Sequence, residues 1–319
     1  RDTAGNQAAN RGLQRRLAHA VQDGVLPGAL AAVTDNGTVT HVTAGVGDLR
    51  TGAKVPKDGY LRIASNTKMF TAVVILQLVG EGKLGLDDSV EKHLPGVVRG
   101  EGIDASKITI RQLLQHTSGL KTDTFLDKGI LPVRDRYFEA RDLVDSALAQ
   151  GSAFEPGTDW SYSNTGYVLL GLVAQRVTGR PFAEEVTRRI IEPLGLKKTY
   201  YPGPGDRTVR APHPRGYLEV DGELVDITEF DPSIAGAAGQ IIATPSDLNR
   251  FLVALHGGRL LKPRELAEMR RTVPAPGLPE GWEYGLGLVK IPLSCGGVAW
   301  GHGGDADGYQ SRAAITEDG

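Results

Sequence analysis

The chain has 319 residues and a formal net charge of −2 at pH 7, from 36 Lys and Arg and 38 Asp and Glu. This balance argues against electrostatic capture of nucleic acid or of a membrane surface. Hydrophobic residues make up 40% of the chain, which is enough for a sizeable core in one large domain or two. The most apolar stretch, residues 72–79, is too short to span a membrane and is predicted to be a core helix.

The hydrophobic pattern changes twice along the chain. Residues 11–23 have helical spacing, and residues 29–47 alternate like two strands around an Asn-Gly turn. Over residues 65–195 the period is close to that of a helix, and helices are predicted to dominate. Strands return in the last third of the chain, interrupted by one capped helix over residues 243–258.

The order of these elements predicts an α+β fold. Strands from both ends are expected to form an antiparallel sheet with flanking helices, because no regular alternation of strand and helix supports a parallel sheet. We predict a sheet domain from residues 1–70 and 231–319 and a mostly helical domain from residues 71–230.

A serine and a lysine stand three residues apart at the start of the apolar helix, in RIASNTK (62–68). Residues at this spacing share a helix face, so the Ser65 hydroxyl and the Lys68 amine can meet. Serine needs a base to act as a nucleophile, and a lysine of lowered pKa can be that base. The alternative is that Ser65 is a helix cap and Lys68 a solvated charge.

Two further stretches carry groups that suit the same site. In WSYSN (160–164), Tyr162 and Asn164 are two apart, so in an extended segment a phenol and a carboxamide face the same side. In AWGHGGDADGYQSR (299–312), His302 precedes Gly303 and Gly304 inside a predicted strand. Glycine in a strand indicates close approach of a ligand or another backbone. The alternatives are a capped loop at the first stretch and a β-bulge at the second.

Ser-x-x-Lys, Tyr-x-Asn and His-x-Gly, in this order, resemble the three signatures of the penicillin-recognising serine hydrolases. The variants match the branch of class C β-lactamases, DD-peptidases, esterases and D-aminopeptidases, and are most similar to the secreted Streptomyces-type D-alanyl-D-alanine carboxypeptidases/transpeptidases. The resemblance covers nearly the whole chain and includes ITIRQLLQHTSGL (108–120), YGLGL (284–288) and LSCGG (293–297).

The resemblance implies an active site in the cleft between the two predicted domains and a role for each site residue. Ser65 forms an acyl-enzyme, Lys68 assists as base, and Tyr162 carries the proton to the leaving amine. Asn164 binds the acyl-side amide, and His302 supports Tyr162.

The strand that follows His302 is implied to bind the substrate. The backbone N–H groups of Ser65 and Asp305 form the oxyanion hole. Gly303 and Gly304 leave the strand edge bare, so that substrate can pair with it.

The sequence departs from the carboxypeptidases where these grip the substrate's terminal carboxylate. An arginine and two threonines are replaced by Val289, Gly303 and Asp305, and a cleft tryptophan by Ile234. Lys290 follows Val289 but points to the opposite face of a strand, so it does not replace the arginine. The acyl-transfer groups are retained, whereas the carboxylate grip is absent.

Three functions therefore remain open. The first is a DD-peptidase-like hydrolase of D-amino-acid peptides or amides that is acylated by β-lactams. The second is an esterase, amidase or D-aminopeptidase on the same fold, and the third is a non-catalytic penicillin-binding-like protein. We expect a small-molecule or peptide substrate, a monomer, no cofactor and no metal, because the histidines show no ligand spacing.

The chain has a single cysteine, Cys295, whose expected disulfide bond bears on whether the protein is secreted. The related peptidases pair the cysteine of the LSCG segment with one near their C-terminus. The sequence begins without Met, and Asp318-Gly319 is a turn signal directly after a strand-like run. We therefore expect a secreted protein in which Cys295 is disulfide-bonded to a residue beyond Gly319. The alternative is a buried free thiol.

Overall fold

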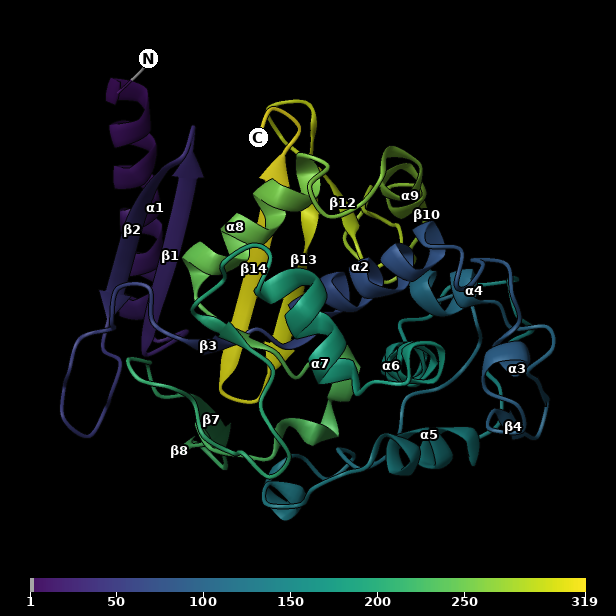
Figure 1. The fold of residues 1–319 in the computed structure, drawn as a ribbon. Coiled ribbons are helices and arrows are strands. Elements are labelled where there is room, and N and C mark those ends of the chain that lie inside the picture. The colour runs from purple at the N-terminus through teal and green to yellow at the C-terminus, as the bar shows by residue number, and fades with distance from the viewer. Residues whose placement is uncertain (1–2) are drawn as a thin grey trace.

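The computed structural model describes residues 3–319 (Figure 1). Its helices are α1 (Thr3–Gln22), α2 (Thr67–Gly80), α3 (Val90–His93), α4 (Ile110–Gln115), α5 (Ala140–Leu148), α6 (Asn164–Thr178), α7 (Phe182–Val186), α8 (Pro245–His256) and α9 (Pro263–Met269). Two short 3₁₀ turns, η1 (Ala64–Asn66) and η5 (Gly236–Ala238), matter for the site. As predicted, α2 to α7 lie in the middle of the chain.

The largest sheet is antiparallel and comes from the C-terminal end. Its strands, in spatial order, are β10 (Val273–Pro274), β11 (Glu283–Tyr284), β12 (Val289–Pro292), β13 (Val298–Ala306) and β14 (Tyr309–Thr316). A three-stranded sheet contains β3 (Leu61–Arg62), β9 (Ile242–Ala243) and β6 (Thr199–Tyr200). Three hairpins are β1 (Gly28–Asp35) with β2 (Thr38–Gly45), β4 (Arg99–Gly100) with β5 (Ile103–Asp104), and β7 (Tyr217–Val220) with β8 (Glu223–Asp226).

The α+β class is confirmed, and both ends of the chain supply antiparallel strands. Within residues 3–319, however, the β1–β2 hairpin and the β10–β14 sheet are hydrogen-bonded separately. Figure 1 shows α8 between the hairpin and β14. Asn249 of α8 donates a side-chain hydrogen bond to the Ala32 carbonyl of β1 at 2.9 Å, so the helix holds the two sheets together.

Helix α2 is the centre of the core. It is apolar all round, and such a helix is stable only when it is enclosed by other elements. The Phe70 ring stacks on Phe251 of α8 with ring centroids 3.9 Å apart. Thr71 Oγ1 donates to the Ala237 carbonyl of η5 at 2.6 Å, and Thr67 Oγ1 accepts from the Ile241 N–H at 3.1 Å. These contacts fix the start of α2 against η5.

The division into two domains stays a prediction. One hydrophobic cluster runs from the sheet into the helices, and residues from both sides of the expected boundaries at 70 and 230 belong to it. In residues 3–319, no helix is long and apolar enough to cross a membrane.

Cys295 lies in the turn between β12 and β13 and is exposed. The alternative of a buried thiol is therefore wrong for this position. The expected disulfide to a residue beyond Gly319 remains a prediction.

Gly303 and Gly304 of β13 have different surroundings, and their expected role as a bare substrate edge stays a prediction. A Cβ atom on Gly304 would lie 2.1 Å from the Ile63 carbonyl oxygen, so this glycine lets β13 pack directly on the turn that carries Ser65. At Gly303, a Cβ atom would meet only the side chain of Arg312, at 3.2 Å. Close approach of two backbones, rather than of a ligand, explains Gly304.

This difference predicts opposite sensitivities of the two glycines. Gly304→Ala forces η1 and β13 apart and should lower the free energy of unfolding by about 1–3 kcal/mol or more. Gly303→Ala, the matched control, displaces only a flexible side chain and should cost about 1 kcal/mol or less. Urea denaturation of both variants measures the difference, and equal stabilities would contradict the close packing of β13 on η1.

Candidate active site

The turn before α2 places Ser65 at the edge of the core. Sequence analysis predicted that Ser65 opens the helix, whereas it lies in the 3₁₀ turn η1 and α2 begins at Thr67. Ala64 has a φ of 46°, a left-handed conformation that is strained for a residue with a Cβ atom. Such strain is concentrated at functional sites. Asn66 Nδ2 holds the turn by donating to Ser311 Oγ at 2.8 Å and to the Ile63 carbonyl at 3.2 Å.

The Lys68 amine is completely buried and lies at the centre of the site. Its Nζ atom is 2.9 Å from Ser65 Oγ, 2.8 Å from Asn164 Oδ1 and 2.9 Å from the carbonyl oxygen of Ala238. These partners come from η1, from the first residue of α6 and from η5. The predicted meeting of Ser65 and Lys68 is thus present, and Asn164 joins them.

Burial lowers the pKa of Lys68 well below its usual value, because the charged form loses its hydration. The hydrogen bonds fit the uncharged amine. A neutral amine has two hydrogens and one lone pair, and the carbonyl oxygens of Asn164 and Ala238 can only accept. Both hydrogens are then used, and the lone pair is left for the Ser65 hydroxyl. Lys68 is therefore arranged to take the Ser65 proton.

Tyr162 covers the other side of this amine. The centroid of its ring lies 4.7 Å from Lys68 Nζ. Burial raises the pKa of Tyr162, although its hydrogen bond with Ser65 opposes the shift. The phenol thus keeps its proton at neutral pH, while the nearby amine tends to lose its own. Groups whose surroundings drive their pKa values apart in this way can serve as acid and base.

His302 is neutral and held by two hydrogen bonds. Its Nδ1 lies 2.6 Å from the Gly303 carbonyl oxygen, which can only accept, so Nδ1 carries the hydrogen. Its Nε2 then accepts from the Tyr284 hydroxyl at 2.8 Å. Burial lowers the pKa of His302 to about 3, and the charge of Arg312 contributes to the shift. The ring centroids of His302 and Tyr162 are 6.3 Å apart, so His302 faces the phenol that it was expected to support.

Three buried residues of the site were missed by sequence analysis, namely His116, Tyr167 and Tyr284. They form an aromatic layer beneath Tyr162, with the His116 ring 4.3 Å from that of Tyr162 and 4.7 Å from that of Tyr284. Tyr167 donates to the Leu114 carbonyl at 2.5 Å. The signal was present, because His116 lies in QLLQHTSGL and Tyr284 begins YGLGL, but neither segment indicated a contact with Tyr162.

The positions where the carboxylate grip was expected to be missing have different surroundings. Val289 is buried in an apolar cluster with Trp160 and Tyr284. The Asp305 carboxylate is 62% exposed, and its Oδ1 accepts from Arg312 Nη1 at 2.8 Å. Its expected repulsion of a substrate carboxylate is therefore largely neutralised. Ile234 is also buried, and it lies two residues before the start of η5 at Gly236.

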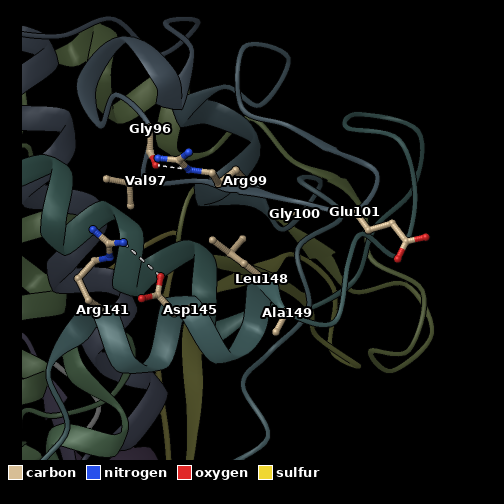
Figure 2. Close-up of a pocket in the computed structure, with 9 residues that line it drawn as sticks. All are labelled: Gly96, Val97, Arg99, Gly100, Glu101, Arg141, Asp145, Leu148 and Ala149. Carbon is tan, nitrogen blue, oxygen red and sulfur yellow. Dashed lines mark hydrogen bonds and ion pairs between the residues drawn. The ribbon is translucent and has the colours of Figure 1, made fainter.

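A hollow lies away from these residues, between the β4–β5 hairpin and α5 (Figure 2). It has a volume of about 350 Å³, and Arg141 and Asp145 of α5 form an ion pair of 3.3 Å on its wall. No serine, histidine or cysteine lines it. Across residues 3–319, no three His, Cys, Asp or Glu side chains are grouped to hold a metal ion. The chemistry is therefore sought at Ser65.

Comparisons with known proteins agree with this geometry. Residues 13–319 match the Beta-lactamase family. Penicillin-binding protein 4 of Amycolatopsis lactamdurans is 32% identical over 304 residues, which are 91% of this chain and 78% of that protein. The D-stereospecific amidohydrolase from Streptomyces sp. has 43% identity and a TM-score of 0.90, covering 98% of this chain and 91% of the other.

A further solved structure is similar to this chain. The D-amino acid amidase from Ochrobactrum anthropi SV3, in complex with D-phenylalanine, has 30% identity and a TM-score of 0.85, with 97% and 88% of the two chains covered. Together with the buried Ser65–Lys68 pair at the start of α2, these likenesses lead to one conclusion: the chain belongs to the Beta-lactamase family and is a serine hydrolase.

Proposed function

We propose that this protein hydrolyses amides of D-amino acids through an acyl-enzyme on Ser65. The observation that carries the proposal is the Lys68 amine, whose two carbonyl partners leave its lone pair for the Ser65 hydroxyl. The likeness to proteins named a D-stereospecific amidohydrolase and a D-amino acid amidase supports the choice of substrate.

Acylation begins at the hydroxyl of Ser65. Lys68 Nζ takes its proton while Oγ attacks the carbonyl carbon of the amide, which gives a tetrahedral intermediate. The C–N bond then breaks, and the leaving nitrogen receives a proton from the Tyr162 phenol, which is replenished from Lys68. The products are an ester on Ser65 and a free amine. Tyr162 acts as an acid here, because its raised pKa keeps the phenol protonated.

The remaining steps use the residues expected from the sequence. The backbone N–H groups of Ser65 and Asp305 stabilise the oxyanion, and Asn164 orients Lys68 by accepting a hydrogen bond from its amine. Water attacks the ester with Lys68 as base, and the D-amino acid leaves as its free acid. A β-lactam ring is a cyclic amide, and we propose that Ser65 attacks its carbonyl carbon as well, which breaks the ring C–N bond and leaves the opened ring as an ester on Ser65.

The surroundings of β13 favour an uncharged leaving group. The Arg312 guanidinium is bonded to Asp305, and Val289 is enclosed by aromatic rings, so neither position offers a free cation to a terminal carboxylate. An amide leaving group needs no such partner. Arginine at 289 would bury its charge among Trp160 and Tyr284, which is costly without a counter-ion.

A carboxypeptidase acting on peptides that end in D-alanyl-D-alanine is the second candidate, favoured by the likeness to a protein named penicillin-binding protein 4. A free-acid substrate distinguishes it from the amidase. Secretion and a monomeric state are retained as proposals alongside either function.

The first prediction concerns the nucleophile. A D-amino-acid p-nitrophenyl ester or a fluorescent penicillin should acylate Ser65, which is partly exposed beside the Lys68 amine. Mass spectrometry of the labelled protein should place one adduct on Ser65 and none in Ser65→Ala. Ser118, a buried serine in the helical part, provides the matched control as Ser118→Ala, which should label like the wild type. An adduct elsewhere contradicts the assignment.

The second prediction concerns pH. Because burial lowers the pKa of Lys68, acylation should rise with pH as the amine loses its proton and then reach a plateau below the usual lysine range. Lys68→Arg keeps the positive charge but cannot act as a base, and should lower the acylation rate by about 10²–10⁴-fold. A Lys68→Arg rate within threefold of wild type would show that only the charge matters.

The pH dependence of the free energy of unfolding measures the protonation state of Lys68 independently of the reaction. The unfolded chain binds a proton at Lys68 that the folded chain has released, so stability should rise with pH between the lowered folded-state pKa and the unfolded one. Lys68→Met should remove this slope. If the Lys68→Met variant keeps the slope of the wild type, Lys68 is charged in the folded protein.

The third prediction concerns the leaving group. Asp305→Asn should release Arg312 and raise kcat/KM for a D-alanyl-D-alanine free acid, relative to its amide, by about two- to fivefold, since both side chains are exposed. The double variant Asp305→Asn/Arg312→Ala should lose the gain. A wild-type preference of tenfold or more for the free acid would favour the carboxypeptidase instead.

A further inference from the structure

His116 contacts the Tyr162 ring and the backbone on both sides of it, although the two residues belong to different segments of the chain. It follows the last residue of α4 with a φ of 65° and is 1% exposed. We infer that His116 is a positioning residue, which holds the Tyr162 phenol where it can protonate the leaving group. This inference rests on the proposed function of Tyr162.

His116 makes three contacts with Tyr162 and its two neighbours in the chain. The His116 carbonyl accepts the backbone N–H of Ser161 at 3.0 Å, and His116 Nδ1 accepts the backbone N–H of Ser163 at 3.0 Å. The residues on both sides of Tyr162 are thus bonded to a single partner. The imidazole ring also lies against the Tyr162 ring, with centroids 4.3 Å apart and planes tilted by 36°. Backbone and ring of Tyr162 are therefore fixed together.

The chemical state of His116 suits this role. An Nδ1 that accepts a hydrogen bond leaves the ring hydrogen on Nε2, so the imidazole is neutral. Burial lowers the pKa of His116 well below its usual value and keeps the ring neutral. Its Nε2 is buried without a hydrogen-bond partner among the described residues, and the Trp160 ring stands edge-on at 5.7 Å. Protonation would break the bond to Ser163, which makes the neutral ring a fixed support.

Positioning matters most for the phenol. Lys68 has three partners from three elements, whereas Tyr162 lies in the irregular segment before α6. A tyrosine ring moves with its backbone, and a proton donor acts only within hydrogen-bond reach of the leaving atom. Loosening residues 161–163 would therefore misplace the phenol while the Ser65–Lys68 pair stays intact.

Two substitutions separate the contacts. His116→Asn places a side-chain oxygen near the position of Nδ1 and suits the left-handed backbone, so it retains the bond to Ser163. His116→Phe retains the ring and leaves the Ser163 N–H unpaired. His116→Ala removes both contacts and replaces the Phe variant if the latter does not fold. His93→Asn, which removes another largely buried histidine, on α3, is the matched control.

The readout compares two substrates with one acyl group, D-phenylalanine amide and D-phenylalanine p-nitrophenyl ester. The amide needs a proton on its leaving nitrogen, whereas p-nitrophenolate departs without one. A general structural defect slows both reactions, but a misplaced phenol slows only the amide. His116→Phe should lower kcat for the amide roughly tenfold or more and leave KM and the ester rate within about threefold. His116→Asn and His93→Asn should stay within about threefold of wild type on both.

A double-mutant comparison completes the test. In a Tyr162→Phe background, His116→Phe should cause no further loss of the amide rate, because the group that it positions is gone. Equal losses on amide and ester, an undiminished loss in the Tyr162→Phe background, or a defect in His116→Asn as large as in His116→Phe would each overturn the inference. If Tyr162→Phe itself leaves the amide rate unchanged, the proposed role of Tyr162 fails first. The two failures are thereby distinguished.

Discussion

The burial of one amine organises this protein. Lys68 loses its hydration at the start of the most enclosed helix, and this burial favours the uncharged amine, whose two hydrogens can be accepted by Asn164 and Ala238. Those partners come from three separate segments, and Thr67 and Thr71 tie one of them, around η5, to the same helix. A lysine whose amine had only one of these partners could turn toward solvent and regain its charge. The core around α2 therefore does more than stabilise the fold, because it keeps a base neutral.

Burial also keeps the titratable side chains around the Lys68 amine uncharged. The hydrogen bond from the Ser163 N–H requires a neutral His116 ring, burial lowers the pKa of His302 to about 3, and burial keeps the Tyr162 phenol protonated. In a region of low dielectric, neutral donors and acceptors cost less than separated charges. In the proposed reaction, protons therefore move among Ser65, Lys68 and Tyr162, while the surrounding histidines stay neutral. The aromatic layer contributes to the burial that shifts the pKa values of these groups.

The sequence predicted the parts of the site that local spacing determines. Ser65 and Lys68 are one helical turn apart, and Tyr162 precedes Asn164 by two, so each pair could be placed on one face from the sequence alone. The structure brings both pairs together. The α+β class also followed from the order of strands and helices.

Contacts between distant segments could not be found in this way. The Ala238 carbonyl is a backbone group, which no residue type announces, and His116 reaches Tyr162 only because α4 and α6 pack together. Gly304 was interpreted as a substrate edge, but its neighbour is the Ile63 carbonyl, from the opposite end of the chain. The Lys68 amine is buried and bonded to Ser65 and Asn164, whereas Asp305 and Arg312 form an exposed ion pair. A substitution in this exposed ion pair changes the charge near the leaving group of the substrate without disturbing Lys68. Substrate choice in this fold can therefore vary while the acyl-transfer chemistry stays the same.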